Sequence, residues 1–233
     1  MFGWEFPPHI SGGLGTACYG LTRGMSSIPN LEILFVVPKA YGDEDQSRIK
    51  LVGAGDISVD IRRVKENQYL KDLSYIEINS NLVPYTSPDE YEELVNKAEH
   101  QGKRFVETSM GGKLNFTGTY GKNLYEEIAN YAVVAAEIAL QEDFDIIHSH
   151  DWLTYPAGIA AKRASGKPMV IHVHATDFDR SGGKVNPTVF EIEKMGMHLA
   201  DKIVAVSNLT RNTVIDKYGI HPDKVVTVYN AVD

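Results

Sequence analysis

The amino-acid sequence predicts an α/β fold in which a mainly parallel sheet has helices on both faces. From residue 123 onward, short apolar runs alternate with amphipathic segments, and helical segments of about 10–15 residues between strands are typical of βαβ units. The chain also opens on a short strand, a proline turn and a glycine-started helix. Its 233 residues are enough to bury a large core. The predicted architecture is a three-layer α/β/α domain.

The first elements are predicted from residues 1–38. MFGWEF has the composition of a short strand, and Pro7 and Pro8 break it. A helix opens near Gly12, and the apolar run LEILFVVP at 31–38 forms the next strand.

Residues 38–122 are predicted to be an irregular insertion. Ile57–Val64 and Leu73–Ile78 alternate as strands do. Ser87 is followed by proline and two acidic residues, which predicts a helix start. The glycine-rich stretch 109–123 fits a loop over a binding cleft, and it fits a plain surface loop equally well.

The second half of the chain is strongly periodic. Leu124, Ile128 and Tyr131 recur at helical spacing and begin a long amphipathic helix. Capping residues and apolar runs then predict, in order, a strand ending at His148, a helix at Tyr155–Arg163, a strand at Met169–Val173, a helix from Asn186-Pro187 to Leu199, a strand at Lys202–Val206, a helix from Ser207 to Gly219 and a strand at Val225–Val228.

The composition of the chain argues against several kinds of partner and location. The net charge of −8 argues against nucleic acid as a partner. The sequence contains no apolar run near the roughly 20 residues that span a bilayer, and its start does not resemble a signal peptide. Cys18 is the single cysteine, so no internal disulfide forms. We therefore expect a cytoplasmic protein without a transmembrane segment.

Candidate site residues follow the two strands that end in HxH pairs. Ligands of open α/β sheets bind outside the carboxyl ends of the strands. His148 and His172 are expected to be structural, whereas the residues beyond them are expected within reach of a ligand. The candidates are His148, His150, Asp151, His172, His174 and Asp177.

The early glycine turn is a second candidate site. Gly12, Gly13 and Gly15 let a ligand approach the backbone, and the free N–H groups of the following helix point at any phosphate there. The pattern is tighter than GxGxxG, which weakens a dinucleotide interpretation. Close packing of strand on helix is the alternative explanation.

The HxH pairs also suggest a metal site. Barrel hydrolases use such pairs at strand ends, but they need further ligands on later strands, and 202–207 and 225–230 carry no such ligand. We therefore expect no metal and no other cofactor. A serine hydrolase is excluded because no GxSxG elbow is present. Cys18 is expected to be a packing residue.

Taken in order, five segments resemble the N-terminal half of GT-B glycosyltransferases, in particular the retaining, glycogen and starch synthase-like group. The segments are SGGLGT at 11–16, HSHDW at 148–152, PMVIHVHATDF at 168–178, ADKIVAVS at 200–207 and DKVVTVYNAVD at 223–233. The chain has Ile10 where bacterial glycogen synthases have a lysine, which favours the broader relatives of this group.

The resemblance implies one half of a GT-B fold, with residues 1–229 as a Rossmann-like acceptor-side domain and 230–233 as the start of a linker to an absent donor-binding domain. It implies that Gly12 and Gly13 line the donor phosphates and that the catalytic His174 lies beside the donor sugar. The implied acceptor-side residues are His150, Asp151, Trp152 and Asp177.

The function expected from this resemblance is hexosyl transfer from a nucleotide sugar, a UDP- or ADP-hexose, to a glycan acceptor such as an α-glucan. The donor domain would act in cis, and the isolated domain would be inactive. Two alternatives remain open: a metal-dependent hydrolase that uses the HxH pairs, and a standalone carbohydrate-binding domain.

Overall fold

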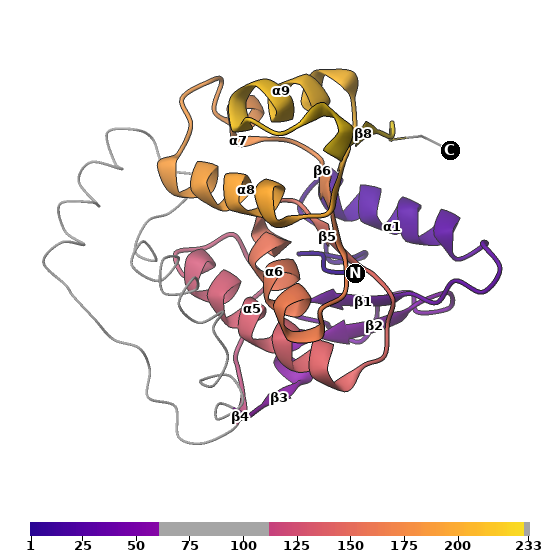
Figure 1. Cartoon of the computed structure of the whole chain (residues 1–233). Helices are drawn as coiled ribbons and strands as arrows, with labels where there is room; N and C mark the ends of the chain where they lie inside the picture. The colour runs from indigo at the N-terminus through magenta and orange to yellow at the C-terminus, as the bar shows by residue number, and fades with distance from the viewer. Residues whose placement is uncertain (61–111, 231–233) are drawn as a thin grey trace, which may run out of the picture.

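The main sheet is parallel. The structure is a computed structural model that describes residues 1–60 and 112–230. β1 (Leu34–Val37) pairs with β2 (Lys50–Gly53) in parallel. The other strands form a parallel run in the order β5 (Ile147–His150), β6 (Met169–Val173), β7 (Lys202–Ala205) and β8 (Val225–Thr227) (Figure 1). The predicted parallel sheet is confirmed.

Residues 1–3 join the two groups of strands into one sheet. Phe2 forms parallel bridges to Val36 of β1 and to Ser149 of β5. The Phe2 N–H donates to the His148 carbonyl at 2.8 Å, and the His150 N–H donates to the Phe2 carbonyl at 3.0 Å. The strand order is therefore β2, β1, residues 1–3, β5, β6, β7, β8, which begins like the 3-2-1-4 order of a Rossmann fold.

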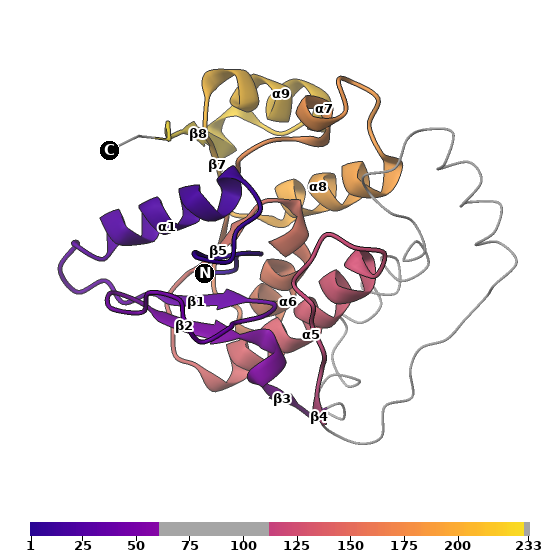
Figure 2. The ribbon, with the colours of Figure 1, turned by 180° about the vertical axis from the view of Figure 1, so that it is seen from behind.

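Helices cover both faces of this sheet. α1 (Gly13–Met25) lies on one face, and α5 (Leu124–Gln141), α6 (Tyr155–Ser165) and α8 (Pro187–Leu199) lie on the other (Figures 1 and 2). α9 (Asn208–Tyr218) packs beside β7 and β8. The three layers confirm the predicted α/β/α architecture.

Local capping chemistry sets the helix ends, as the sequence predicted. The Asn186 side chain accepts from the Thr188 N–H at 2.9 Å and starts α8. The Ser207 hydroxyl accepts from the Thr210 N–H at 3.0 Å and starts α9. Gly219 ends α9 with φ +69°, a left-handed conformation that favours glycine.

Some elements differ from the prediction. The segment predicted to be irregular contributes β2 to the main sheet. The strand expected at 57–64 is the two-residue β3 (Ser58–Val59) within the described residues, and it pairs antiparallel with β4 (Gly112–Lys113). A short helix that was not predicted, α7 (Asp177–Arg180), follows β6. The strand predicted at Leu73–Ile78 and the helix predicted after Ser87 lie outside the described residues.

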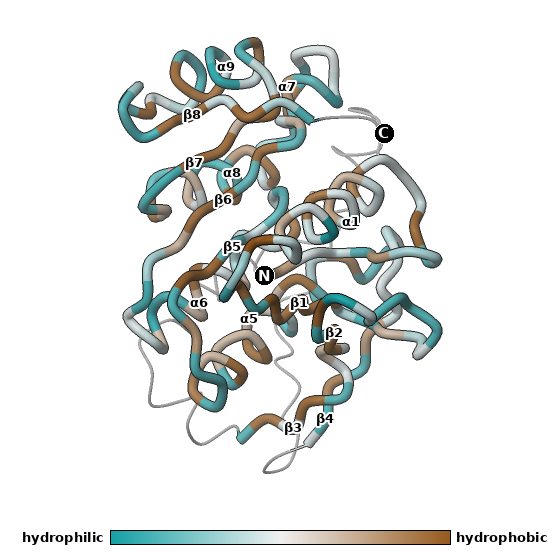
Figure 3. The backbone as a smooth tube through the Cα atoms, turned by 90° about the vertical axis from the view of Figure 1, so that its right-hand side faces the viewer, coloured by the Kyte–Doolittle hydropathy of each residue, from teal (hydrophilic) through white to brown (hydrophobic). Residues whose placement is uncertain are grey.

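The core lies between the sheet and the helices. Hydrophobic stretches follow β6 and β7 through the interior of the molecule, whereas β5, with the sequence IHSH, is mainly hydrophilic (Figure 3). Tyr131 of α5 is buried, and its hydroxyl donates to the carbonyls of Gly3 at 3.0 Å and Val36 at 2.6 Å. Among the described helices, none has the length and apolarity that crossing a membrane requires.

Two helical glycines predict opposite effects of the same substitution. A Cβ on Gly196 of α8 would lie 2.4 Å from Cδ2 of Tyr155 on α6. We expect Gly196→Ala to lower the free energy of unfolding by about 1–3 kcal/mol through overpacking. A Cβ on Gly20 of α1 would meet no described atom within 4 Å. We expect Gly20→Ala to raise it by up to about 1 kcal/mol. Urea unfolding of both variants is the measurement, and a stabilised Gly196→Ala would contradict the packing.

Candidate functional site

The candidate site lies at the switch point of the sheet. From residues 1–3 the chain passes through α1 to β1 on one side, whereas β5 lies on the other side of the same segment. The loops that leave these two neighbouring strands diverge, and ligands of open α/β sheets bind in the resulting crevice. The glycine turn follows one strand, and Asp151 follows the other.

Glu5 holds the glycine turn through hydrogen bonds to its side chain. Its carboxylate is buried and accepts from the Ser11 N–H at 2.9 Å, the Ser11 hydroxyl at 2.7 Å and the Gly15 N–H at 3.2 Å. The Gly15 bond satisfies one of the free N–H groups at the start of α1 and places a negative charge beside the positive end of the helix dipole.

The three glycines of the turn have different surroundings. A Cβ on Gly15 would lie 2.3 Å from Cγ2 of Ile10, so Gly15 is required for close packing. A Cβ on Gly12 or Gly13 would meet nothing within 4 Å in the part of the chain that the structure describes. Packing therefore explains Gly15, and Gly12 and Gly13 face space in which a ligand could lie. Their donor-side role remains a prediction.

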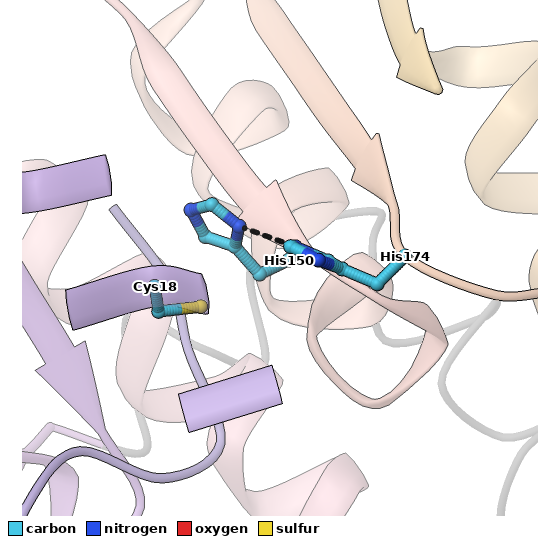
Figure 4. Close-up of side chains that lie close together, drawn as sticks. All are labelled: Cys18, His150 and His174. Atoms are coloured by element: carbon cyan, nitrogen blue, oxygen red, sulfur yellow. Dashed lines mark hydrogen bonds between the residues drawn. The ribbon is translucent and has the colours of Figure 1, made fainter. Parts of the chain in front are cut away.

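The four histidines of the HxH pairs form one cluster on the α1 face of the sheet. His150 stacks on His148 with ring centroids 4.4 Å apart, and His174 stacks on His172 at the same spacing. β5 and β6 are neighbours with His150 opposite His172. The Nδ1 of His150 and the Nε2 of His174 share a hydrogen bond of 3.1 Å (Figure 4). The two strand ends thus meet as the sequence predicted.

Burial keeps these imidazoles neutral. It lowers the pKa of His148 and of His172 to about 3, and nearby histidines act in the same direction. Burial also lowers the pKa of His150 well below its ordinary value. The pKa of His174 is lowered by burial too, although the Asp151 charge opposes this shift. Among the described residues, the fully buried ring nitrogens of these histidines that have no hydrogen-bond partner are Nε2 of His148, Nε2 of His150 and both nitrogens of His172.

The histidines bring possible metal ligands together. Ligand atoms of Cys18, His150 and His174 lie within 4.8 Å of one another (Figure 4), and so do those of His148, His150 and His172. A metal ion lies in the plane of each imidazole that binds it, whereas the rings of the second group are stacked face to face with interplanar angles of 3–29°. Burial raises the pKa of the Cys18 thiol, which disfavours the thiolate that binds metal. These arrangements favour packing, and the absence of a metal remains a prediction.

Asp151 has a strained backbone. Its φ of 63° and ψ of 167° fall in a region that is essentially restricted to glycine and costs about 1–3 kcal/mol. Its buried carboxylate accepts from the His174 N–H at 3.0 Å, from the Ala175 N–H at 3.5 Å and from the Arg180 guanidinium at 2.6 Å. Strain of this size persists where surrounding contacts over-determine it, which often occurs at functional sites.

The other predicted residues lie deeper than expected. His150 is 0% exposed, Trp152 2% and Asp177 6%, whereas His150 and Asp177 were expected within direct reach of a ligand. The Trp152 ring packs against Tyr125, and the Asp177 carboxylate accepts from the Asn186 N–H. Burial raises the pKa of Asp177. Helix α1 covers His150, a long-range contact that a strand-end pattern does not reveal. The acceptor-side role of these residues remains a prediction.

Three residues of the site were not identified from the sequence. Glu5 holds the glycine turn, and Arg180 and Glu193 connect the loop after β6 to its neighbours. A glutamate just before a glycine turn, and an arginine closely following a strand-end histidine, were the available signals.

The fold and the site define a class: a Rossmann-like α/β domain whose glycine turn and strand-end histidines meet at the switch point. The chain belongs to Glycosyltransferase Family 4, whose sequence profile matches residues 112–233. This membership confirms the resemblance to the N-terminal domain of GT-B glycosyltransferases.

Curated relatives are glycosyltransferases of several kinds. An uncharacterized glycosyltransferase of Methanocaldococcus jannaschii is 22% identical over 236 residues, which cover 100% of this chain and 46% of the relative. A D-inositol 3-phosphate glycosyltransferase of Acidothermus cellulolyticus is 31% identical over 44% of this chain and 24% of its own length. A glycogen synthase of Mycobacterium tuberculosis is 26% identical over 38% of this chain and 22% of its own length. The chain therefore spans less than half the length of each of these relatives.

The buried histidines predict a loss of stability in acid. Below pH 6.5 the unfolded chain binds protons at His148 and His172, whereas the folded chain does not bind them until about pH 3. We therefore expect the free energy of unfolding to fall as the pH falls from 6.5 toward 3, by up to about 1.4 kcal/mol per pH unit for each histidine. Urea unfolding at a series of pH values measures this slope.

A matched pair of variants tests whether the buried histidines cause this pH dependence of the free energy of unfolding. His172→Gln removes one buried titrating group, so its slope should be shallower than that of the wild type. His221 is 76% exposed in its side chain, and His221→Gln should leave the slope unchanged. Equal slopes for all three proteins would contradict this explanation of acid sensitivity.

The backbone conformation of Asp151 predicts that glycine and alanine at this position give different stabilities. Asp151→Gly and Asp151→Ala both lose the carboxylate and its contacts, so the difference between them reports on the backbone at φ 63°. We expect the glycine variant to be more stable than the alanine variant by about 1–3 kcal/mol, because glycine adopts this conformation without strain. Thermal and urea unfolding measure the difference, and an alanine variant as stable as the glycine variant would show that no strain is stored.

Proposed function

We propose that this chain is the acceptor-side domain of a retaining hexosyltransferase. The enzyme transfers a sugar from a nucleotide sugar, a UDP- or ADP-hexose, to a glycan acceptor. The observation that carries the proposal is the convergence of His174 and α1, the helix that the glycine turn begins, at the switch point of a Glycosyltransferase Family 4 domain. A cytoplasmic location is part of the same proposal.

The donor-side chemistry assigns roles to the glycine turn and to His174. A departing nucleoside diphosphate gains negative charge, and backbone N–H groups near Gly12 and Gly13 can stabilise it. The sugar develops positive charge in the transition state. His174 meets this charge as a neutral imidazole, since burial lowers its pKa. Its Nε2 is bonded to His150, so the Nδ1 edge is the one available to a ligand.

The acceptor side is proposed to lie over the HDW segment. His150, Asp151 and Trp152 are buried, so they shape the floor of the site, and groups around them make the outer contacts. Names among the relatives include glycogen synthase and D-inositol 3-phosphate glycosyltransferase. An α-glucan is the acceptor class that we favour, and a polyol phosphate is the first comparison in an acceptor screen.

A second domain is proposed to hold most of the donor. The relatives are more than twice as long as the segment that they share with this chain. In the proposed enzyme that additional length supplies the nucleotide-binding domain in cis. Residues 1–233 alone are then expected to bind oligosaccharide weakly and to transfer no sugar, because half of the required contacts are missing.

His174 provides the test of this function. In the full enzyme we expect His174→Ala to lower kcat about a hundredfold, the cost of removing one preorganised group from a transition state. The melting temperature should change less than in a variant of a fully buried histidine, because His174 is only partly buried. The rate is measured as sugar transfer from UDP- and ADP-hexoses to glucan oligomers.

His172 is the matched control. Its imidazole is buried beneath His174, so His172→Ala should lower the melting temperature and leave kcat closer to that of the wild type. The proposal is wrong if His174→Ala keeps the full rate, or if residues 1–233 by themselves turn over a nucleotide sugar.

A further inference from the structure

Arg180 binds two carboxylates that come from different elements. One guanidinium nitrogen lies 2.6 Å from Oδ2 of Asp151, which directly follows β5, and another lies 3.2 Å from Oε1 of Glu193 in α8. The Asp151 and Glu193 side chains are almost fully buried, and the Arg180 side chain is 22% exposed. Removing one partner of a buried charge pair strongly destabilises a protein, because the other charge is left buried without compensation.

Both carboxylates also hold the loop that begins at His174. Asp151 accepts the N–H of His174, the first residue after β6. Glu193 accepts the N–H of Asp177 at 3.0 Å and the hydroxyl of Tyr218. Arg180 lies at the end of the same loop and ties it to both acceptors. The backbone of 174–180 is thereby fixed at its start, its middle and its end.

We propose that Arg180 is a positioning residue that fixes His174 by clamping Asp151 and Glu193. The role of His174 in catalysis rests on the proposed function, whereas the clamp itself does not. Arg180 acts through Asp151: the guanidinium holds Oδ2, which leaves Oδ1 to hold the His174 N–H. The clamp also holds the strained turn at Asp151 in place.

The geometry requires arginine. A planar guanidinium presents several N–H donors in a fixed fork, so it reaches two carboxylates at once. A lysine ammonium keeps the positive charge but is a single point on a flexible stem. Arg180→Lys therefore removes the forked donor geometry and keeps the positive charge.

The charged and titratable groups around His174 come from several elements. Asp151 raises its pKa and Arg180 lowers it. Neutral His150 and His172 contact its ring, and Cys18 of α1 lies close by. Glu193 is the second carboxylate of the clamp; burial raises its pKa, whereas the Tyr218 hydroxyl, the Arg180 charge and the Asp177 N–H act in the opposite direction and favour the carboxylate.

The test measures His174 directly by NMR on residues 1–233, with no need for turnover. In Arg180→Lys we expect the His174 amide to exchange with solvent about tenfold faster or more, because Asp151 no longer holds it firmly. The His174 pKa should stay near its wild-type value because the positive charge is kept. In Arg180→Met the pKa should rise, and in Asp151→Asn it should fall.

Arg211 is the matched control. Its guanidinium bonds the carbonyls of Val225 and Pro222, near the start of β8 and so at the opposite end of the sheet from His174. Arg211→Lys should lower the melting temperature without changing amide exchange at His174. If Arg180→Met fails to fold, Arg180→Lys and Asp151→Asn still decide the result. Unchanged exchange of the His174 amide in Arg180→Lys would overturn the proposal.

A turnover assay of the full enzyme separates this proposal from the proposed function. If both hold, Arg180→Lys lowers kcat about tenfold or more with little change in the KM for the acceptor. If the wild type transfers no sugar, the proposed function fails, and the NMR result still decides whether Arg180 positions His174. An active enzyme in which Arg180→Lys loosens His174 but keeps the full kcat would overturn the link to catalysis.

Discussion

The structure depends on the insertion of residues 1–3 between β1 and β5. The Val36 N–H donates to the Met1 carbonyl at 2.8 Å, and the Gly3 N–H donates to the Val36 carbonyl at 2.9 Å, while Phe2 bonds β5 on its other edge. A Cβ on Gly3 would lie 2.4 Å from the Phe35 ring, so close approach requires glycine there. This central strand makes one sheet of two groups of strands. It also creates the switch point at which the glycine turn and the HxH pairs meet.

The sequence was informative where structure is encoded locally. Asn186, Ser207 and Gly219 cap their helices through bonds to residues a few positions away, so α8 and α9 could be bounded from the sequence. The strand β2 was missed because its four residues carry no alternation and gain their burial from β1. The four-residue α7 was missed because its capping box lies in a loop and no apolar periodicity follows.

Some features of the candidate site could also be predicted from the sequence, and others depend on tertiary packing. The meeting of His150 with His174 follows from the rule that parallel strands end at one edge, and the structure bears this out. The full burial of His150 does not follow from that rule, because α1 docks over it from a distant part of the chain. The partners Arg180 and Glu193 are likewise joined to Asp151 only by the fold. A sequence pattern places a side chain at an edge, and tertiary packing decides whether it faces a ligand or holds its neighbours.

Charge at the start of α1 bears on how a diphosphate could be bound. Helix N-termini attract anions because their N–H groups are free and the helix dipole is positive there. In this chain the Glu5 carboxylate already takes the Gly15 N–H, so a diphosphate at Gly12 and Gly13 would lie near a fixed negative group. A diphosphate with two or more negative charges therefore gains less from the remaining N–H groups here than at a helix start without such a carboxylate. Cationic side chains outside the glycine turn would add to this stabilisation, which fits the proposal that a second domain holds the nucleotide while this domain supplies His174 and binds the acceptor.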